Sequence, residues 1–305
     1  FAQLWQVELR QVPLTREKRT LNAKDAVAMC DENTICVVAI AGVTWTGLND
    51  DVEALDKELG AFNERKGLDI PIHVDAASGG FILPFVSPDT RWDFRLRGVA
   101  SISTSGHKFG LVYPGLGWVV WRDKALLPEE MSFSVNYLSA EVTQVGLNFS
   151  RPAAQILGQY YNFIRLGREG YTQVQQNSME IARYCHSRIG AMECFENYST
   201  DVVNPLFVWC LSEEWQRSAK WTLYDLQASL QQSGWMVPAY TLPASIEDIV
   251  VMRIVVRQGM SRDMADMLLG DIERSVKELD ALKYPTSSRQ AYDDKVKQLG
   301  KVFTH

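Results

Sequence analysis

The sequence has no long apolar run. Hydrophobic residues make up 46% of the 305 positions, yet no stretch approaches the roughly 20 apolar residues that a helix needs to span a bilayer. Residues 1–10 also lack the basic start and apolar core of a secretory signal. We therefore predict a soluble chain that does not cross a membrane.

Cysteine is sparse, and basic charge is not in excess. The five cysteines form an odd set without a C-x-x-C pair or a His cluster at zinc-ligand spacing. They favour reduced thiols in a cytoplasmic protein over a disulfide framework or a metal site. The formal net charge of -6 gives no basic footprint for nucleic acid. A small molecule is the expected partner.

The apolar residues that are present alternate between strand and helix spacing. Runs over 35–41, 70–76, 99–104 and 117–122 predict strands, and 51–66 has helical spacing. This order predicts an α/β fold with a mostly parallel sheet and helices on both of its faces. Ligands of such sheets bind beyond the carboxyl ends of the strands.

The pattern changes after residue 122. Residues 126–149 are expected to be rich in loops, and a helical region should begin near Pro152 and continue to about Met192. A buried strand over 205–212, a helix over 223–232, a strand over 248–257 and a helix over 261–282 capped by Ser261 predict a smaller α/β domain. The expected division is 1–165, 166–283 and a tail over 284–305.

Two residues after the strand-like runs can carry chemistry. Asp75 lies at the end of the strand-like run over 70–76, and Lys108 lies 33 residues later, just past the run over 99–104. A lysine amine can form a Schiff base with a carbonyl cofactor, and a carboxylate at a neighbouring strand end can keep a pyridine nitrogen protonated. Such a pair is more often a solvated charge and a helix cap, so the interpretation depends on its neighbours.

The neighbours of this pair favour a pyridoxal phosphate site. Ala77 offers only a methyl group where a flat ring would lie, and His107 adds a hydrogen-bond donor suited to phosphate. We expect Ser105, Gly106 and Gly110 to keep the turn around Lys108 open.

Several longer motifs resemble one enzyme family. The runs over 43–47, 73–81, 101–110, 148–152 and 250–254 are similar to those of glutamate decarboxylases, which belong to the group II decarboxylases that use pyridoxal phosphate. The resemblance extends from the first residues to about Leu282. It implies a fold-type I, aminotransferase-like architecture, with 1–165 as the C-terminal part of the large cofactor-binding domain and 166–283 as the small domain.

The resemblance also implies roles for individual residues. Lys108 would link the cofactor covalently, and Asp75 would pair with its pyridine nitrogen. The other implied cofactor contacts are Ala77 against the ring, Thr44 near the ring oxygen or the substrate, Ser105 and His107 at the phosphate, and Ser150 at the phosphate of a neighbouring subunit. Taken singly, Ala77 and Thr44 are ordinary core and strand residues.

Arg253 is the candidate substrate-binding residue. It lies in an apolar strand, where an unpaired guanidinium is costly. The usual partner of a buried arginine is a protein carboxylate, whereas the resemblance implies the α-carboxylate of the substrate.

The activity implied by the resemblance is the decarboxylation of L-glutamate to 4-aminobutanoate and carbon dioxide by a homo-oligomer. Two alternatives stay open: another group II decarboxylase acting on an aromatic or sulfinic amino acid, and an inactive chain that serves as an oligomer partner. The missing initial Met and the absence of the family's main phosphate loop favour a fragment whose beginning lies upstream.

The basic stretch over 295–303 lies where plant members of the family carry a calmodulin-binding tail. We expect Gly300 to interrupt a helix there, and a solvated tail is therefore favoured over a calmodulin site.

Overall fold

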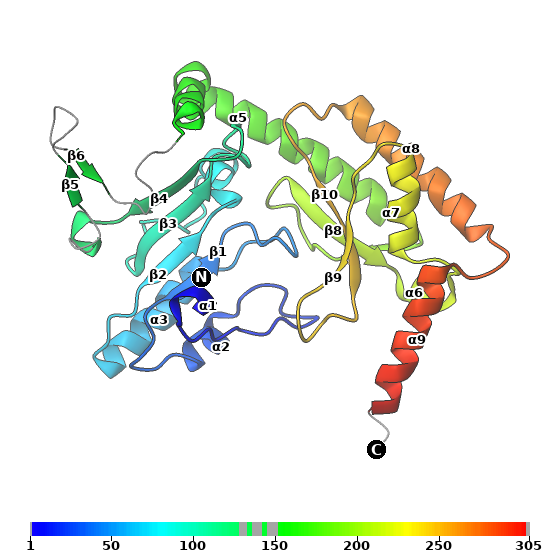
Figure 1. Ribbon diagram of the computed structural model, residues 1–305, viewed down its shortest axis with the longest axis horizontal. Helices are drawn as coiled ribbons and strands as arrows, with labels where there is room; N and C mark the ends of the chain where they lie inside the picture. Colours follow the sequence, from blue (N-terminus) through cyan, green and yellow to red (C-terminus); the bar gives the residue numbers. More distant parts are fainter. Residues whose placement is uncertain (1, 128–132, 136–141, 145–151, 303–305) are drawn as a thin grey trace. The chain divides into compact units, whose positions relative to one another are not determined.

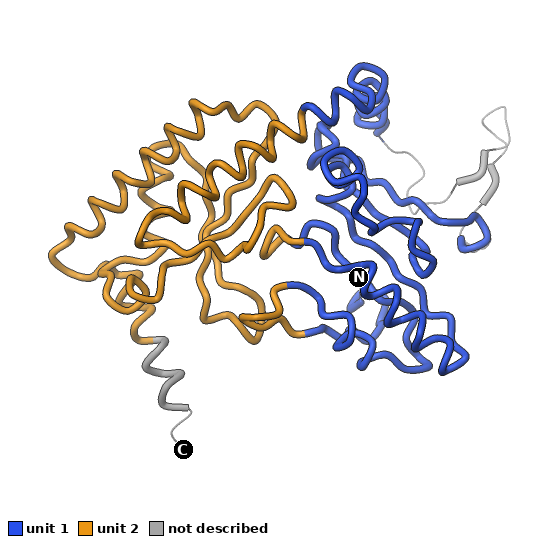
Figure 2. Tube along the Cα trace, turned by 180° about the vertical axis from the view of Figure 1, so that it is seen from behind, with its two compact units in different colours: residues 1–12, 20–43, 49–173 blue, residues 13–19, 44–48, 174–305 orange. Residues whose placement is uncertain are grey.

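The computed structural model of the chain describes residues 2–127, 133–135, 142–144 and 152–302. The chain forms two units, each with its own sheet (Figures 1 and 2). The first unit comprises residues 1–12, 20–43 and 49–173, and the second comprises 13–19, 44–48 and 174–305. Two short early segments therefore belong to the second unit.

The first unit contains the four-stranded sheet β1-β2-β3-β4 (Figure 1). Strands β1, β2 and β3 are parallel, and β4 is antiparallel to β3, which confirms the predicted mostly parallel sheet. Its elements are α1 (Ala2–Trp5), α2 (Ala23–Ala28), β1 (Val37–Ile40), α3 (Val52–Lys66), β2 (Ile72–Asp75), η1 (Gly79–Phe81), α4 (Leu83–Val86), β3 (Val99–Ser105), β4 (Gly117–Trp121), η2 (Lys124–Leu126), β5 (Phe133–Val135) and β6 (Val142–Gln144).

Helix α3 shows why the predicted boundaries hold. The side chain of Asp51 accepts a hydrogen bond from the N–H of Ala54 at 2.9 Å and caps the first turn. At the other end Gly67 has a left-handed conformation with φ of 66°, which glycine adopts without steric cost. Leu55 and Leu59 of this helix are buried against Ile72 and Val74 of the sheet. The prediction of a helix over 51–66 is confirmed.

The opposite face of the first sheet is more open. Val38 and Ile40 of β1 and Val119 and Trp121 of β4 remain 36–57% exposed. They flank the polar side chains of β2 and β3 on the same face, as the strand register shows. Helices on both faces were expected, but within the described residues these apolar side chains stay accessible. The expectation holds for one face only.

The second unit is built on an antiparallel sheet in the order β7-β8-β10-β9. All six residues of β8 are buried, including Phe207 and Trp209, which confirms the buried strand predicted over 205–212. Helix α7 packs against α8, β9 and β10. The elements are β7 (Phe195–Asn197), β8 (Leu206–Leu211), α6 (Glu213–Ser218), α7 (Leu223–Gln232), β9 (Ala239–Thr241), β10 (Val250–Val255), α8 (Arg262–Asp280) and α9 (Ser287–Val302).

Capping side chains mark the first residues of helices α7 and α8 in the second unit. Ser261 accepts a hydrogen bond from the N–H of Met264 at 3.1 Å, as predicted for α8. Thr222 and Asp225 form a capping box at the start of α7, where Asp225 accepts a hydrogen bond from the N–H of Thr222 at 2.7 Å. The helix predicted over 223–232 is confirmed at both ends.

Helix α5 (Ala154–Gly190) agrees with the long helical region predicted from Pro152 to Met192. It is interrupted at Gly167, whose φ of 57° and ψ of -164° are not helical. Before this break, one side of the helix exposes an apolar stripe. We call these residues the α5 stripe: Ile156, Leu157, Tyr160, Tyr161 and Ile164, each 48–68% exposed.

The tail forms a helix beyond Gly300. Helix α9 continues to Val302, so the expected interruption at Gly300 is wrong. A single glycine inside a helix costs only about 1 kcal/mol relative to alanine. The side chains from residue 295 onward lie outside the described ones, so the preference for a solvated tail over a calmodulin site stays a prediction.

The five thiols are not paired with one another. Cys185, Cys194 and Cys210 are buried, whereas Cys30 and Cys36 are partly exposed. Burial raises the pKa of the Cys194 and Cys210 thiols to about 12. Within the described residues no helix is both long and apolar enough to cross a membrane.

Candidate active site

The carboxyl ends of β1, β2 and β3 meet at one edge of the first sheet. Ile40 pairs with Asp75, and Asp75 pairs with Ser103. Past the strands the ladder continues, because the N–H of Ala76 donates to the carbonyl of Ser103 at 2.8 Å. The turns after β2 and β3 therefore start side by side, where ligands of parallel sheets bind.

The turn after β2 packs closely against the neighbouring strands. A Cβ atom on Gly79 would lie 2.7 Å from the carbonyl oxygen of Ala41, and one on Gly80 would lie 2.4 Å from Oγ1 of Thr104. Glycine is required at both positions because any side chain would collide. This close packing fixes the backbone between Asp75 and the first turn of η1.

Asp75 is the last residue of β2 and is half-buried. Its Oδ1 accepts a hydrogen bond from the N–H of Ala77 at 2.9 Å. The bond folds the carboxylate over the following turn and orients it. No ion pair involves Asp75 within the described residues.

Lys108 lies in the turn after β3 and is exposed. Its Nζ donates to Oγ of Ser78, which is buried, at 3.4 Å, near the upper limit for a hydrogen bond. This contact brings the amine to the turn that follows Asp75. Lys108 forms no ion pair in the part of the chain that the structure describes, so its amine is weakly held.

The turn around Lys108 is closed, and the expectation that Gly106 and Gly110 keep it open is wrong. A Cβ atom on Gly110 would lie 2.6 Å from the carbonyl oxygen of Gly106. Gln159 and Tyr171, both buried, donate to the carbonyl of Gly110 at 2.8 and 2.9 Å. The two glycines therefore let the backbone at 106 and at 110 come close together. The side chains of Gln159 and Tyr171 from α5 hold the carbonyl of Gly110 in place.

The predicted phosphate ligands lie in the same turn. Ser105 ends β3, and its carbonyl accepts a hydrogen bond from the N–H of Lys108 at 3.3 Å. His107 is half-buried, and its Nδ1 is buried without a partner in the described residues. A buried polar atom without a partner is unusual, and a bound anion is one group that would satisfy it. Ala77, after Asp75, presents only a half-buried methyl group.

His73 is a site neighbour that sequence reasoning missed. It precedes Asp75 by two residues on the same face of β2, and its ring nitrogens lie 2.7 Å from Oγ of Ser101 and 3.2 Å from Oγ of Ser103. Burial lowers the pKa of His73, and the nearby charge of Asp75 partly opposes this shift. The alternation of His73 with Asp75 and of Ser101 with Ser103 was the available signal, because i and i+2 share a strand face.

Arg253 and Thr44 both belong to the second unit. Nη1 of Arg253 donates to the carbonyl of Thr44 at 3.1 Å, and the guanidinium lies 5.7 Å from the centre of the Tyr240 ring. Nε of Arg253 is buried without a partner, and no carboxylate pairs with this arginine among the described residues. Burial raises the pKa of Tyr240 to about 12, with Arg253 opposing it. Arg253 thus contacts the backbone carbonyl of Thr44, whereas the sequence analysis proposed a role for the Thr44 hydroxyl.

The structure thus gathers five of the predicted residues in the first unit: Asp75, Ala77, Ser105, His107 and Lys108. Thr44 and Arg253 contact one another in the second unit. Ser150 lies outside the described residues.

Comparison with known proteins gives the family. Residues 1–211 match the model of the pyridoxal-dependent decarboxylase conserved domain. The chain is 44% identical to glutamate decarboxylase beta of Listeria innocua over 279 residues. These aligned residues make up 92% of this chain and 60% of that relative. Glutamate decarboxylase 5 of Arabidopsis thaliana is 47% identical over 282 residues, or 92% of this chain and 56% of the relative. The chain therefore spans less than two thirds of these relatives.

Solved structures give the same result. The glutamate decarboxylase of Lactobacillus brevis superimposes with a TM-score of 0.87 at 41% identity, over 92% of this chain and 63% of that one. A sphingosine-1-phosphate lyase of Burkholderia pseudomallei superimposes with a TM-score of 0.74 at 24% identity. The superposition includes all of this chain and 64% of the lyase chain, and it supports the fold alone. Since the family model covers more than half of the sequence, the chain belongs to the family of pyridoxal-dependent decarboxylases.

Proposed function

We propose that this chain is a large part of a pyridoxal phosphate-dependent carboxy-lyase that converts L-glutamate to 4-aminobutanoate and carbon dioxide. One observation carries the proposal: Asp75 ends β2, Lys108 follows the neighbouring parallel strand β3, and Ser78 joins the lysine amine to the turn after Asp75. The names of the relatives, with 43–47% identity, supply the choice of glutamate.

The residues present fit pyridoxal phosphate. Lys108 has an accessible amine that no carboxylate holds in the described residues. His107 has a buried ring nitrogen without a partner, which suits an anionic group. Ala77, whose N–H bonds to Asp75, presents only a small, half-buried methyl group, against which a flat ring could pack. We propose these residues, with Ser105, as cofactor contacts.

When bound, the cofactor supplies an electron sink for the pair of electrons released as the carboxylate leaves. In the proposed site the Asp75 carboxylate holds a proton on the pyridine nitrogen, which keeps that sink effective. The hydrogen bond from Ala77 fixes the direction of this carboxylate. In this proposal Lys108 would hold the cofactor, and its amine would return a proton to the carbon that has lost carbon dioxide.

We propose that Arg253 binds the α-carboxylate of the substrate. Its buried Nε is an unused donor, and its Nη1 is steadied by the carbonyl of Thr44. A guanidinium can hold a carboxylate through two parallel hydrogen bonds. Such a grip would fix the orientation of the amino acid, and with it the bond that is aligned to break.

We also propose a homo-oligomer and a cytoplasmic location. The α5 stripe supports the first proposal, because a contiguous exposed apolar strip typically marks an interaction surface. The five unpaired thiols are consistent with a reducing compartment. The implied role of Ser150 at a neighbouring subunit belongs to the same proposal.

Cofactor attachment and substrate choice are tested together. The chain, produced with pyridoxal phosphate, should absorb visible light, and borohydride should join the cofactor to Lys108, as peptide mass spectrometry would show. Lys108→Ala should lose the adduct, whereas Lys124→Ala, at another exposed lysine, should keep it. A panel of amino acids should then show carbon dioxide release from glutamate well above aromatic and sulfinic substrates. A colourless chain without an adduct would support the inactive alternative instead.

A further inference from the structure

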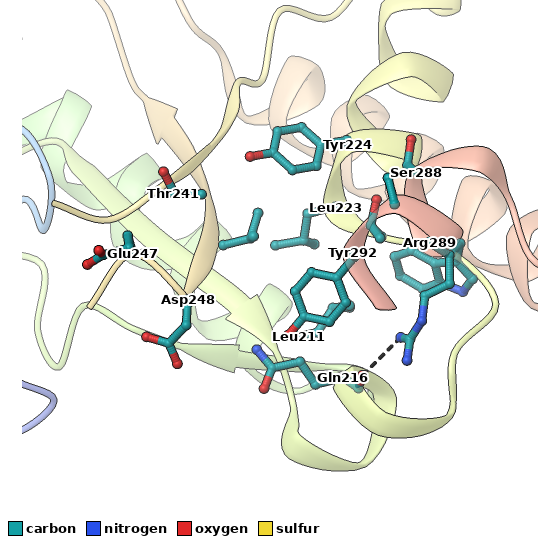
Figure 3. A pocket seen from close by; sticks show the side chains of 14 residues that line it. Leu211, Gln216, Leu223, Tyr224, Thr241, Glu247, Asp248, Ser288, Arg289 and Tyr292 are labelled. Carbon is teal, nitrogen blue, oxygen red and sulfur yellow. Dashed lines mark hydrogen bonds between the residues drawn. The ribbon is translucent and has the colours of Figure 1, made fainter. Parts of the chain in front are cut away.

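The second unit holds a pocket of about 400 Å³ whose lining includes none of the residues of the proposed decarboxylase site (Figure 3). It lies among the end of β8, the start of α7, strands β9 and β10, and the first turns of α9. Pockets of this size accept small molecules. All of its lining residues belong to one unit.

The inner wall of the pocket is apolar and aromatic. Trp221 and Leu223 are fully buried, and Leu211 is nearly so. Tyr224 from α7 and Tyr292 from α9 form opposing sides, and Figure 3 shows their rings around the side chain of Leu223. Flat rings on such walls favour a flat apolar occupant.

Two of the charged side chains that line the pocket, Arg289 and Asp248, are already engaged. Arg289 donates to the carbonyls of Gln216 and Arg217 at 2.9 and 3.3 Å and forms an ion pair with Asp293 at 2.9 Å. Asp248 is paired with Arg16. In Figure 3 the carboxylates of Glu247 and Asp248 extend away from the apolar side chains. A charged ligand group would therefore lose water inside without gaining a partner.

Neutral hydrogen-bonding groups remain available. Gln216, Thr241 and Tyr292 line the pocket, and none of their side chains makes a hydrogen bond within the described residues. Burial raises the pKa of the Tyr292 hydroxyl above its ordinary value of 10.0. The hydroxyl thus stays protonated near neutral pH and can donate as well as accept.

From these contacts we infer a second ligand site, for an uncharged, flat, largely apolar molecule with one hydroxyl or amide group. Such an occupant, on the order of ten to fifteen non-hydrogen atoms, packs its ring between Tyr224 and Tyr292 and uses the neutral polar groups for orientation. Because these walls come from α7 and α9, the bound molecule also holds the start of α9 in place. The site is independent of the proposed decarboxylase activity.

The probe for this site is 2-naphthalenemethanol, compared with its charged counterparts 2-naphthylmethylammonium and 2-naphthoate. Ligand-observed NMR titration of the full chain should give a Kd on the order of 0.1–1 mM for the neutral probe. Each charged counterpart should bind about ten-fold more weakly. Hydrogen exchange of residues 287–294 should slow when the neutral probe is bound.

Two variants on α9 separate the pocket from the helix that carries it. Ala291 lines the pocket and is exposed, so Ala291→Trp should fill the space and abolish binding without large strain. Gln290→Trp, at the adjacent exposed position outside the lining, should bind as the unaltered chain does. If Ala291→Trp fails to fold, Tyr224→Ala should weaken binding about five-fold by removing one aromatic wall.

Several results would overturn the inference. These are no saturable binding of the neutral probe up to its solubility limit, equal affinity for the carboxylate, and unchanged binding in both Ala291→Trp and Tyr224→Ala. Slower exchange in α9 with the charged probes alone would contradict it as well.

Discussion

At the scale of single residues, Asp75 combines two properties that a substitution can separate. Its charge is the property that the proposed chemistry uses, and its Oδ1 accepts the hydrogen bond from Ala77 that shapes the turn. Asparagine keeps an acceptor at the same place but carries no charge. The Asp75→Asn variant therefore tests the charge with the local backbone preserved.

We predict that Asp75→Asn still binds pyridoxal phosphate but loses activity by about 10²-fold or more, a loss of the size expected when a group that stabilises the transition state is removed. Cofactor absorbance and carbon dioxide release from glutamate would be measured on the same sample. Asp69→Asn, at an exposed aspartate before β2, is the control and should keep both signals. Unchanged turnover in Asp75→Asn would remove Asp75 from the proposed reaction.

His73 gives a prediction about stability and pH. Burial lowers its pKa below the ordinary value of 6.5, so the unfolded chain binds a proton before the folded chain does. As pH falls through about 6.5, folding therefore loses stability, until the lower pKa of the folded state is reached. Glutamine can retain hydrogen bonds to Ser101 and Ser103 without titrating in this range.

The expected result is that the free energy of unfolding falls less between about pH 7.5 and about pH 5.5 in His73→Gln than in the unaltered chain. Urea titrations at both pH values would measure it. An equal or larger decrease in the variant would show that His73 is not a source of this pH dependence.

At the scale of elements, the Lys108 turn depends on backbone proximity. Gly110→Ala would place a Cβ atom 2.6 Å from the carbonyl oxygen of Gly106 and 2.8 Å from Gln159. We predict a loss of about 1–3 kcal/mol in the free energy of unfolding, as in other overpacked sites. Thermal and urea unfolding would measure the change.

The matched control for this prediction is Gly60→Ala in α3. No atom outside the helix lies within 4 Å of the added Cβ, and the position is exposed. Alanine is the better helix former, so this variant should gain about 0.5–1 kcal/mol. The same substitution is thus expected to have opposite signs at the two glycines. A stabilised Gly110→Ala would show that the turn is looser than described.

The elements themselves were largely predictable, and their contacts were not. Periodicity and the caps Asp51 and Ser261 placed helices and strands within about two residues, because these signals are local. Periodicity does not say which strands pair or in what direction, so the antiparallel order of the second sheet was not foreseen. The hydrogen bond from Gln159 to the carbonyl of Gly110 joins residues 49 positions apart, and no local sequence pattern predicts it.

In the candidate site too, the residues could be predicted from the sequence, but their contacts could not. Asp75 and Lys108 could be selected because both follow strand-like runs and carry suitable chemistry. The contacts of Lys108 with Ser78 and of Arg253 with the Thr44 carbonyl required the fold. A backbone carbonyl is present at every residue, so composition cannot single one out.

At the scale of the whole molecule, the α5 stripe predicts self-association. Leu157 and Ile164 are 67% and 68% exposed, and burying them against a second copy would be favourable by about 1.5–3 kcal/mol for each side chain. We predict that the double variant Leu157→Lys and Ile164→Lys sediments as a smaller species than the unaltered chain. Sedimentation velocity over a range of concentrations would measure it.

Met236→Lys is the control for this prediction. Met236 is 90% exposed and lies outside the stripe, so the same change of an apolar side chain to lysine there should leave the sedimentation unchanged. If the double variant and the control sediment alike, another surface mediates assembly, or the chain is monomeric.

The short segment 44–48 limits how this protein can be divided for expression. Buried Ser199 donates to the carbonyl of Thr46, and buried Asn204 donates to the carbonyl of Gly47 at 2.9 Å. A cut at residues 173 and 174 would leave both donors in a fragment that lacks their acceptors, at a cost of about 1–3 kcal/mol for each unsatisfied group. A recombinant C-terminal half would therefore need this five-residue segment grafted back, by linker or by circular permutation, before it could fold as it does here.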